Sequence, residues 1–189
     1  MNKSIIIKLH ESVSKKTILF ALLLVTVLLS LLLTKIDQAI TRSGGMDVIY
    51  LQIAFSPKDF QIVLDTWGTK GIKKYLDNLW LDYFVTFISA LFMMSAIAYF
   101  QRRRKLFSAE NIGWYNIIFF LLPFFSIFFD YLENVLHHII ITDKKLNLVL
   151  IASISSSIKF LIIGSSLIYL LLSYFAVRKE TREKKMEIP

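Results

Sequence analysis

Ionisable and polar residues interrupt an apolar stretch in the second half of the chain. The segment FDYLENVLHH, residues 129–138, directly follows the apolar segment NIIFFLLPFFSIF, residues 116–128. On a helix, Asp130, Glu133, Asn134 and His137 occupy positions i, i+3, i+4 and i+7, so they share one face. Ionisable groups within an apolar span normally face protein or a wet cavity, and each needs a partner. The pattern therefore predicts a buried polar site.

The next apolar segment offers a counter-ion for this site. Its sequence SISSSIK covers residues 153–159, and the loop TDKKLN precedes it. Asp130 and Lys159 are equally distant from the centre of that loop, so an antiparallel hairpin brings them to the same depth. We expect them to form an ion pair, because an unpaired charge at mid-span costs roughly 2.5–3.5 kcal/mol. The same symmetry brings Glu133 level with Ser156 and Asn134 level with Ser155.

The second apolar segment adds Asp82 and Tyr83, about one turn inside its start. These two residues complete the candidate ligand-binding set, which comprises Asp82, Tyr83, Asp130, Glu133, Asn134, Ser155, Ser156 and Lys159. A buried carboxyl or imidazole group can act as a general acid or base, and the candidates for such catalysis are Glu133, Asp82 and His137.

Several kinds of site fit these residues. The charges can serve only to fix helix packing, they can line an outward-opening cavity that binds a lipid-like ligand, or they can relay protons or ions. The apolar segment 119–129 argues against a relay, because it offers little polar path from Asp130 toward the other side. We predict no metal or cofactor site, because Glu133 and His137 lack the Glu-x-x-His spacing of di-metal bundles.

Four apolar blocks indicate an integral membrane protein. Hydrophobic residues make up 56% of the 189-residue chain, and each block is long enough to cross a bilayer core, for which roughly 20 residues suffice. The first block is too long for a signal-peptide core and has no small-x-small cleavage site after it. We predict an all-α four-helix transmembrane bundle, residues 17–177, between tails 1–16 and 178–189. Its spans are expected at 17–34, 78–100, 114–142 and 146–177.

The basic residues predict the orientation of the bundle. Thirteen lysines and arginines lie in segments 1–16, 101–105 and 178–189, against eight in the opposing loops. The excess places both termini in the cytoplasm, and we expect the membrane to be the bacterial inner membrane. In such a protein the net charge of +8 indicates contact with membrane lipids and not with nucleic acid.

The loop 35–77 is far longer than most helix connections. Its run VIYLQIAF, residues 48–55, is β-rich and of strand length. Ser56 and Pro57 then form a typical helix start, and Gly68 a typical helix end. We expect a short extracytoplasmic helix there, either anchored at the interface by Trp67 or acting as a lid over a cavity.

Several classes of protein are excluded by missing residues. The chain has no cysteine, so it holds no disulfide, thiolate metal site or cysteine nucleophile. The four-helix quinone and vitamin K reductases, which need a cysteine pair, are excluded with them. A phosphate-binding glycine loop, a nucleophile elbow and a zinc-protease signature are also absent from the sequence.

The segment LQIAFSPKDFQIVLDTWGTKGIKKYLDNLWLDYF, the later DYLENVL and a mid-span lysine together resemble a group of uncharacterised small bacterial four-span membrane proteins. The resemblance covers roughly residues 48–170 and rests on Phe55, Trp67, Gly68, Asp82, Asp130, Glu133, Asn134 and Lys159. It implies a topology and a site but no activity. The sterol isomerase and sigma-2 receptor superfamily is similar in architecture only.

These observations together favour a multi-pass membrane protein with an outward-facing polar pocket for a lipid-like ligand. The alternative is a non-catalytic structural or accessory protein whose buried charges only fix helix packing. The sequence assigns neither a reaction nor an oligomeric state.

Overall fold

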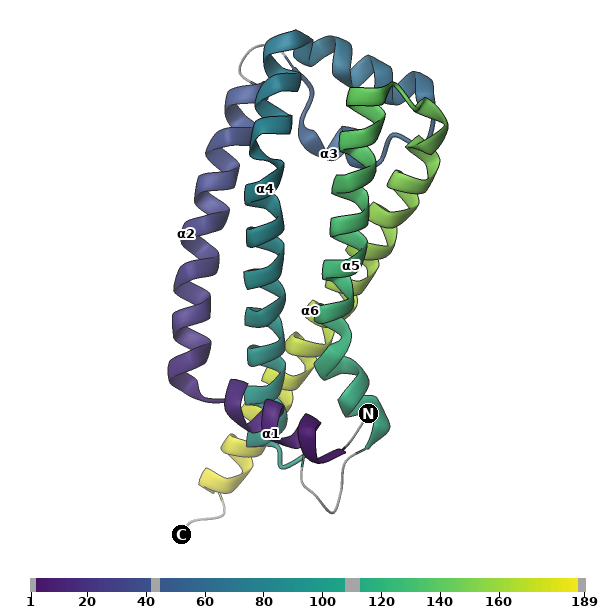
Figure 1. Ribbon diagram of the computed structural model, residues 1–189. Coiled ribbons are helices and arrows are strands. Elements are labelled where there is room, and N and C mark those ends of the chain that lie inside the picture. The colour runs from purple at the N-terminus through teal and green to yellow at the C-terminus, as the bar shows by residue number, and fades with distance from the viewer. Residues whose placement is uncertain (1–2, 42–44, 108–112, 187–189) are drawn as a thin grey trace.

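The computed structural model describes residues 3–41, 45–107 and 113–186, and the regular elements in these ranges are all helices (Figure 1). They are α1 (Lys3–Val13), α2 (Lys16–Thr41), α3 (Val48–Gln52), α4 (Pro57–Arg103), α5 (Trp114–Asp143), the 3-10 helix η1 (Leu146–Leu148) and α6 (Val149–Met186). Within the described chain, four helices, α2, α4, α5 and α6, are long and apolar enough to cross a membrane. The all-α fold class is therefore confirmed.

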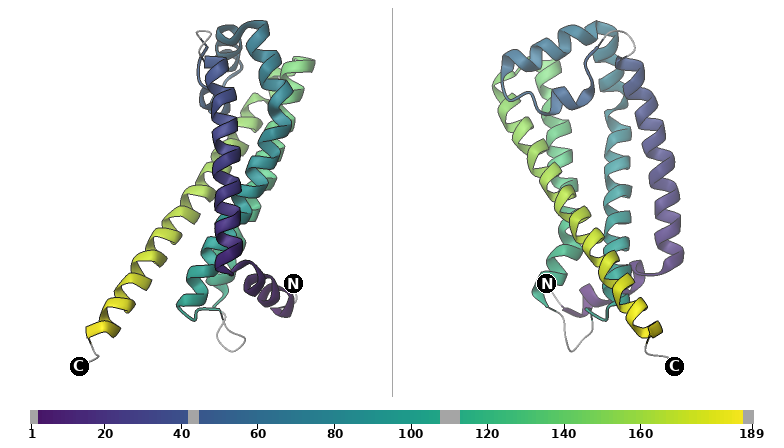
Figure 2. Two further views of the ribbon diagram at one scale, coloured as in Figure 1. Left: turned by 90° about the vertical axis from the view of Figure 1, so that its left-hand side faces the viewer. Right: turned by 180° about the vertical axis from the view of Figure 1, so that it is seen from behind.

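The four long helices form two pairs joined through α4. Helix α2 packs along α4, α5 packs along α6, and α4 also contacts both α5 and α6. Both ends of the described chain lie at one end of the bundle, together with α1 and the last turns of α4 and α6 (Figures 1 and 2). We call this the basic end, and the opposite end, covered by α3 and the first turns of α4, the cap end.

Helix α4 changes direction at the cap end. Its start is capped by Ser56, whose hydroxyl oxygen accepts a hydrogen bond from the Asp59 backbone N–H at 3.2 Å, and Pro57 occupies the first turn. Gly68 has φ 59° and ψ −177°, a conformation that is almost exclusive to glycine. Residues 57–67 therefore cross the cap end, and the rest of α4 runs along the bundle (Figure 1).

The strand predicted for residues 48–55 is wrong, because this segment begins with the short helix α3. The Asp47 carboxylate caps the helix by accepting a hydrogen bond from the Ile49 N–H at 3.1 Å. Leu51 is fully buried in the apolar core of the cap end, against residues from several helices. With no neighbouring strand to pair with, the β-rich composition is overridden by this packing.

The N-terminal tail contains a helix that packs against the basic end. Ile6 of α1 is buried with Met94, Ile97 and Phe120 of α4 and α5. The hydroxyl of Ser95 donates a hydrogen bond to the Val13 carbonyl at 2.6 Å, which ties the end of α1 to α4. At the other terminus, α6 continues as a helix through Met186, well beyond the predicted end of the fourth span.

Helix α2 lies at the edge of the bundle. Of its side chains only Ile40 is buried, whereas large apolar residues such as Phe20, Leu24 and Leu28 are exposed over more than half of their surface. An exposed apolar surface of this extent requires a lipid environment or another apolar partner. The helix is thus suited to face the hydrocarbon core of a membrane.

Candidate functional site

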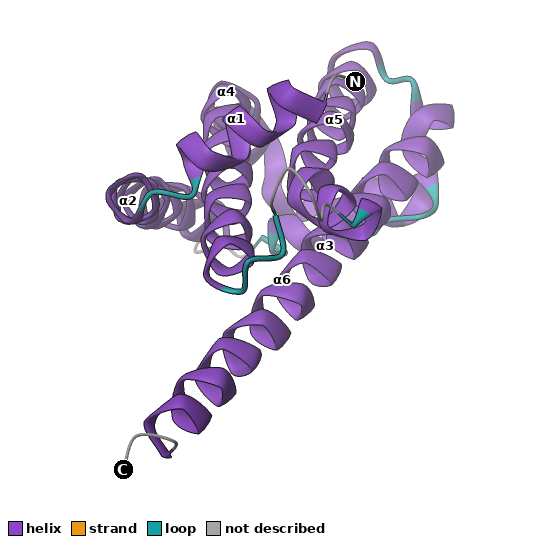
Figure 3. Ribbon diagram, turned by 90° about the horizontal axis from the view of Figure 1, so that it is seen from below, coloured by secondary structure: helices purple, strands orange, loops and turns teal. Residues whose placement is uncertain are grey.

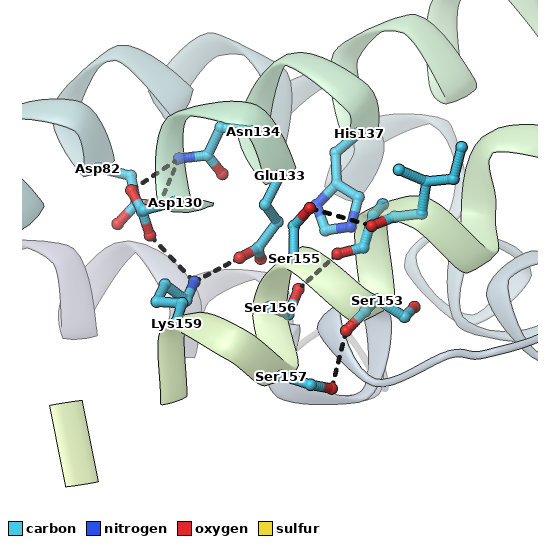
Figure 4. Close-up of polar contacts among 12 residues, drawn as sticks. Asp82, Asp130, Glu133, Asn134, His137, Ser153, Ser155, Ser156, Ser157 and Lys159 are labelled. Atoms are coloured by element: carbon cyan, nitrogen blue, oxygen red, sulfur yellow. Dashed lines mark hydrogen bonds and ion pairs between the residues drawn. The ribbon is translucent and has the colours of Figure 1, made fainter. Parts of the chain in front are cut away.

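An ammonium group held by two carboxylates lies at the centre of the bundle. Lys159 of α6 donates hydrogen bonds to Asp130 Oδ1 at 2.9 Å and to Glu133 Oε2 at 2.5 Å (Figure 4). All three side chains are at most 6% exposed. The Asp130–Lys159 ion pair predicted from the hairpin symmetry is confirmed, and Glu133 joins it because it lies one helical turn from Asp130. The ring of Phe160 covers the ammonium group at 5.0 Å.

Asn134 connects the ion cluster, which consists of Asp130, Glu133 and Lys159, to helix α4. Its amide group donates hydrogen bonds to Asp82 Oδ2 at 2.9 Å and to Asp130 Oδ2 at 3.3 Å. Helices α4, α5 and α6 are therefore joined by one polar network (Figure 4). The network contains three carboxyl groups and one ammonium group, so its acidic groups outnumber its basic one.

A second polar contact lies beside the network, toward the cap end. The Tyr75 hydroxyl and His137 Nδ1 are 2.8 Å apart, and both side chains are buried. Within the described chain, His137 Nε2 and Glu133 Oε1 are buried without a hydrogen-bond partner. Unsatisfied buried polar atoms are costly and uncommon, so these two atoms need a partner such as a water molecule or a shared proton.

The serine hydroxyls of α6 mainly donate hydrogen bonds to backbone carbonyl groups of the same helix. The hydroxyls of Ser155 and Ser156 donate hydrogen bonds to the carbonyl groups of Ile151 and Ala152, one turn earlier. Both side chains are buried, and neither belongs to the lining of the two cavities described next. Ser153 instead donates to the Ala54 carbonyl at 3.0 Å and so fastens α6 to the cap end.

A cavity of about 170 Å³ lies between α2, α3 and α4 at the cap end. Acidic and amide side chains form its polar wall: Asp37, Asp47, Gln52, Asn78 and Asp82. Apolar side chains, together with the Tyr75 ring, form the rest of its lining: Leu33, Ile36, Ile40, Val48, Ile49 and Leu79. We call it the acidic cavity, because its lining includes three aspartates and no lysine, arginine or glutamate.

A second cavity, of about 220 Å³, continues toward the middle of the bundle. Its polar lining includes Asp130 and Lys159 of the ion cluster, and most of the remaining lining is apolar or carries a hydroxyl: Val85, Thr86, Ser89, Ala90, Met93, Ser126, Phe160 and Ile163. We call it the central cavity. Gln52 and Asp82 line both cavities, so the two spaces are adjacent at these side chains.

The predicted site residues therefore separate into three groups. Asp82, Asp130 and Lys159 line a cavity. Glu133, Asn134, His137, Ser155 and Ser156 are buried and line neither cavity. Tyr83 lies apart from the polar network, where its ring meets that of Tyr131 edge-on at 4.7 Å.

The structure adds cavity residues that the sequence analysis did not select. Asp37 lies beyond the predicted end of the first span at residue 34, whereas α2 continues to Thr41. Tyr75 lies seven residues before Asp82, two helical turns away, so the helical period could have placed both on one face. Gln52 was assigned to a strand and carried no distinguishing signal.

The described residues contain no group of three or more histidine, aspartate, glutamate or cysteine side chains arranged to hold a metal ion. Comparison of the chain with protein-family models, curated proteins and solved structures finds no match. The resemblance to small bacterial four-span proteins stays a prediction.

Proposed function

We propose that this multi-pass membrane protein binds a lipid-like amphiphile in the acidic and central cavities. The observation that carries the proposal is the shared lining at Asp82 and Gln52, which places a polar space directly beside a largely apolar one. A polar headgroup fits the acidic cavity, and an apolar chain fits beside Val85, Met93 and Ile163 in the central cavity. Pockets of this kind, mostly apolar with a few convergent polar groups, are typical ligand sites.

The charges indicate which headgroup would bind. Asp37, Asp47 and Asp82 line the acidic cavity without a basic neighbour in its wall. The one lysine in the central cavity, Lys159, is already held by two carboxylates. An anionic headgroup would be repelled here, whereas an ammonium group or another hydrogen-bond donor would be attracted. A positively charged amphiphile is therefore the ligand class that the cavities favour.

A binding measurement with a simple probe tests this proposal. Dodecyltrimethylammonium, titrated below its micellar concentration into protein in maltoside micelles, should bind saturably, and dodecyl sulfate should not compete for the same site. Asp82→Asn should weaken binding of the ammonium probe about tenfold, as loss of one partly desolvated charge contact implies. It keeps an oxygen that can accept from Asn134, so the fold should persist.

Asp77→Asn is the matched control, because Asp77 lies on the same helix but is exposed and lines neither cavity. Equal affinity of wild type, Asp82→Asn and Asp77→Asn for the ammonium probe would contradict the proposal.

The alternative is that the buried charges serve only to hold the helices together. The closed geometry of the ion cluster supports it, because Lys159 has two carboxylate partners and links α5 to α6. Under this alternative, removing the cluster would leave the protein functional as long as it folds. Complementation of a deletion strain by a folded variant that lacks the cluster distinguishes the two functions.

We also infer that the basic end faces the cytoplasm, in a bacterial inner membrane. The distribution of lysine and arginine supports this orientation, because the segments 1–16, 101–105 and 178–189 hold thirteen of them. The acidic cavity would then open near the outer leaflet.

A further inference from the structure

A groove at the basic end combines arginines with aromatic side chains. It has a volume of about 410 Å³ and lies between the last turns of α4 and the C-terminal part of α6. Three arginines line it, Arg103 from α4 and Arg178 and Arg182 from α6, and its lining contains no acidic residue. Arg178 and Arg182 are four residues apart, so they project from one face of the helix.

Among the described residues, the nearby glutamates form their ion pairs with basic side chains outside the groove. Glu180 pairs with Arg104 at 3.5 Å, and Glu183 pairs with Lys179 at 3.8 Å. Neither glutamate lines the groove. The three guanidinium groups thus face a space that attracts an anion, and planar guanidinium groups suit phosphate oxygens particularly well.

The aromatic part of the groove is arranged for contact with hydrocarbon. The Phe100 and Tyr174 rings meet edge-on at 6.2 Å, across α4 and α6. The Arg103 guanidinium group lies 5.8 Å from the centre of the Tyr99 ring, which fixes the arginine beside the groove. Arginine next to tyrosine at the end of a span is typical of the headgroup level of a membrane.

The surface of α6 locates the groove at the membrane boundary. Leu171, Leu172 and Phe175 are each more than half exposed on a helix that projects away from the bundle (Figures 2 and 3). These side chains need hydrocarbon around them, and the basic residues begin directly afterwards, at Arg178. An occupant of the groove therefore has its charged part at Arg178 and Arg182 and its apolar part toward Phe100.

From this arrangement we infer that the groove binds the headgroup of an anionic phospholipid from the leaflet at the basic end. The phosphate accepts hydrogen bonds from Arg103, Arg178 and Arg182, and the start of an acyl chain packs on Phe100 and Tyr174. The inference does not rest on the amphiphile proposed for the acidic and central cavities, which lie elsewhere in the bundle.

Native mass spectrometry tests the inference directly. Protein in maltoside micelles is offered equimolar dioleoylphosphatidylglycerol and dioleoylphosphatidylcholine, and the bound lipids are counted. We expect wild type to retain phosphatidylglycerol preferentially. The triple variant Arg103→Gln, Arg178→Gln, Arg182→Gln should lower this occupancy at least about tenfold, since each basic residue at a membrane surface contributes attraction to anionic lipid.

The matched control removes three positive charges from exposed positions at the same end: Lys8→Gln, Lys15→Gln and Lys16→Gln. It should retain phosphatidylglycerol, and an equal loss in this control would overturn the inference by showing that only net charge matters. Arg182→Gln alone, at an exposed helix end, should lower occupancy severalfold and serves if the triple variant is unstable. Displacement of the lipid by millimolar glycerol 3-phosphate would also overturn the inference, because the groove would then bind soluble phosphate.

Discussion

Lys159 is the residue on which the buried charges depend. Its ammonium group is the one basic partner of Asp130 and Glu133 among the described side chains. Breaking a buried ion pair by removing one member is strongly destabilising, whereas replacing all members by uncharged groups of similar volume is often tolerated. The cluster should therefore behave as a unit.

Lys159→Met should accordingly lower the free energy of unfolding by about 3–5 kcal/mol, because it leaves two buried carboxylates without a counter-ion. The triple variant Asp130→Leu, Glu133→Gln, Lys159→Met should be more stable than Lys159→Met alone. Unfolding in mixed micelles measures both. A triple variant that is less stable than the single one would show that the three charges do not act together.

His10 gives the basic end a dependence on pH. Its ring stacks on Phe107 at 3.8 Å, and its Nε2 lies 3.2 Å from Gln101 Oε1. Burial lowers the pKa of His10 from 6.5 to about 4, the hydrogen bond with Gln101 opposes this effect, and the charge of Arg102 adds to it. The unfolded chain therefore takes up the proton at a higher pH than the folded protein does.

The stability that comes from neutral His10 is complete above about pH 6.5 and is lost as the pH falls from about 6.5 to about 4, by on the order of 2 kcal/mol. Thermal melting at pH 7 and pH 4.5 should show a smaller acid-induced decrease in Tm for His10→Gln than for wild type. His138→Gln, at an exposed position, should keep the wild-type decrease. An unchanged decrease in His10→Gln would rule out His10 as its source.

The change in direction of helix α4 at the cap end depends on one backbone conformation. Gly68 has φ 59° and ψ −177°, and no atom lies within 4 Å of the position of an added Cβ. Any cost of a side chain there thus comes from the backbone and not from crowding. Gly68→Ala should lower stability by about 1–3 kcal/mol, as expected for a non-glycine residue in this region.

Gly164→Ala is the control, because Gly164 lies within α6, also has open space at its Cβ and has no positive φ. It should leave Tm unchanged or raise it slightly, since alanine favours a helix interior by about 1 kcal/mol. Equal Tm values for the two variants would indicate that residues 57–67 can adopt another direction at little cost.

The helices could be predicted to different extents from the sequence. The long apolar runs located the four helices of the described chain that are long and apolar enough to cross a membrane. The loop centre at 144–145 was sufficient to pair Asp130 with Lys159. Ser56 and Pro57 predicted the start of α4, because capping depends on local residue types. Helix α3 was missed because its β-branched residues favour a strand locally, whereas the Asp47 cap and the burial of Leu51 in the assembled core favour the helix.

The contacts of the candidate site could be predicted only where both residues lie in the hairpin formed by α5 and α6. Asp82 was found because it is a charge inside an apolar block, but its bond to Asn134 joins helices that are distant in sequence. The meeting of Asp37, Gln52 and Tyr75 around the acidic cavity depends on how α2 and α3 pack on α4. No spacing along the chain reports that packing.

The whole protein is expected to have one orientation in the membrane. The chain has no cysteine, so a single introduced cysteine reports its own position. Lys58→Cys at the cap end should react with a membrane-impermeant maleimide added to intact cells, and Thr181→Cys at the basic end should react only after the membrane is opened. Both positions are exposed. The reverse pattern would contradict the orientation inferred from the basic residues.

The acidic and central cavities are proposed to hold a ligand, and native mass spectrometry of the gently solubilised protein tests for it. Wild type and Asp77→Asn should each carry one discrete added mass in addition to any lipid at the basic end, and Asp82→Asn should lose that mass while keeping a similar Tm. Identification of the added mass would give the ligand class, which we expect to be a positively charged amphiphile. A ligand-free mass for wild type, or an added mass that Asp82→Asn retains in full, would contradict the claim and assign the buried charges to helix packing.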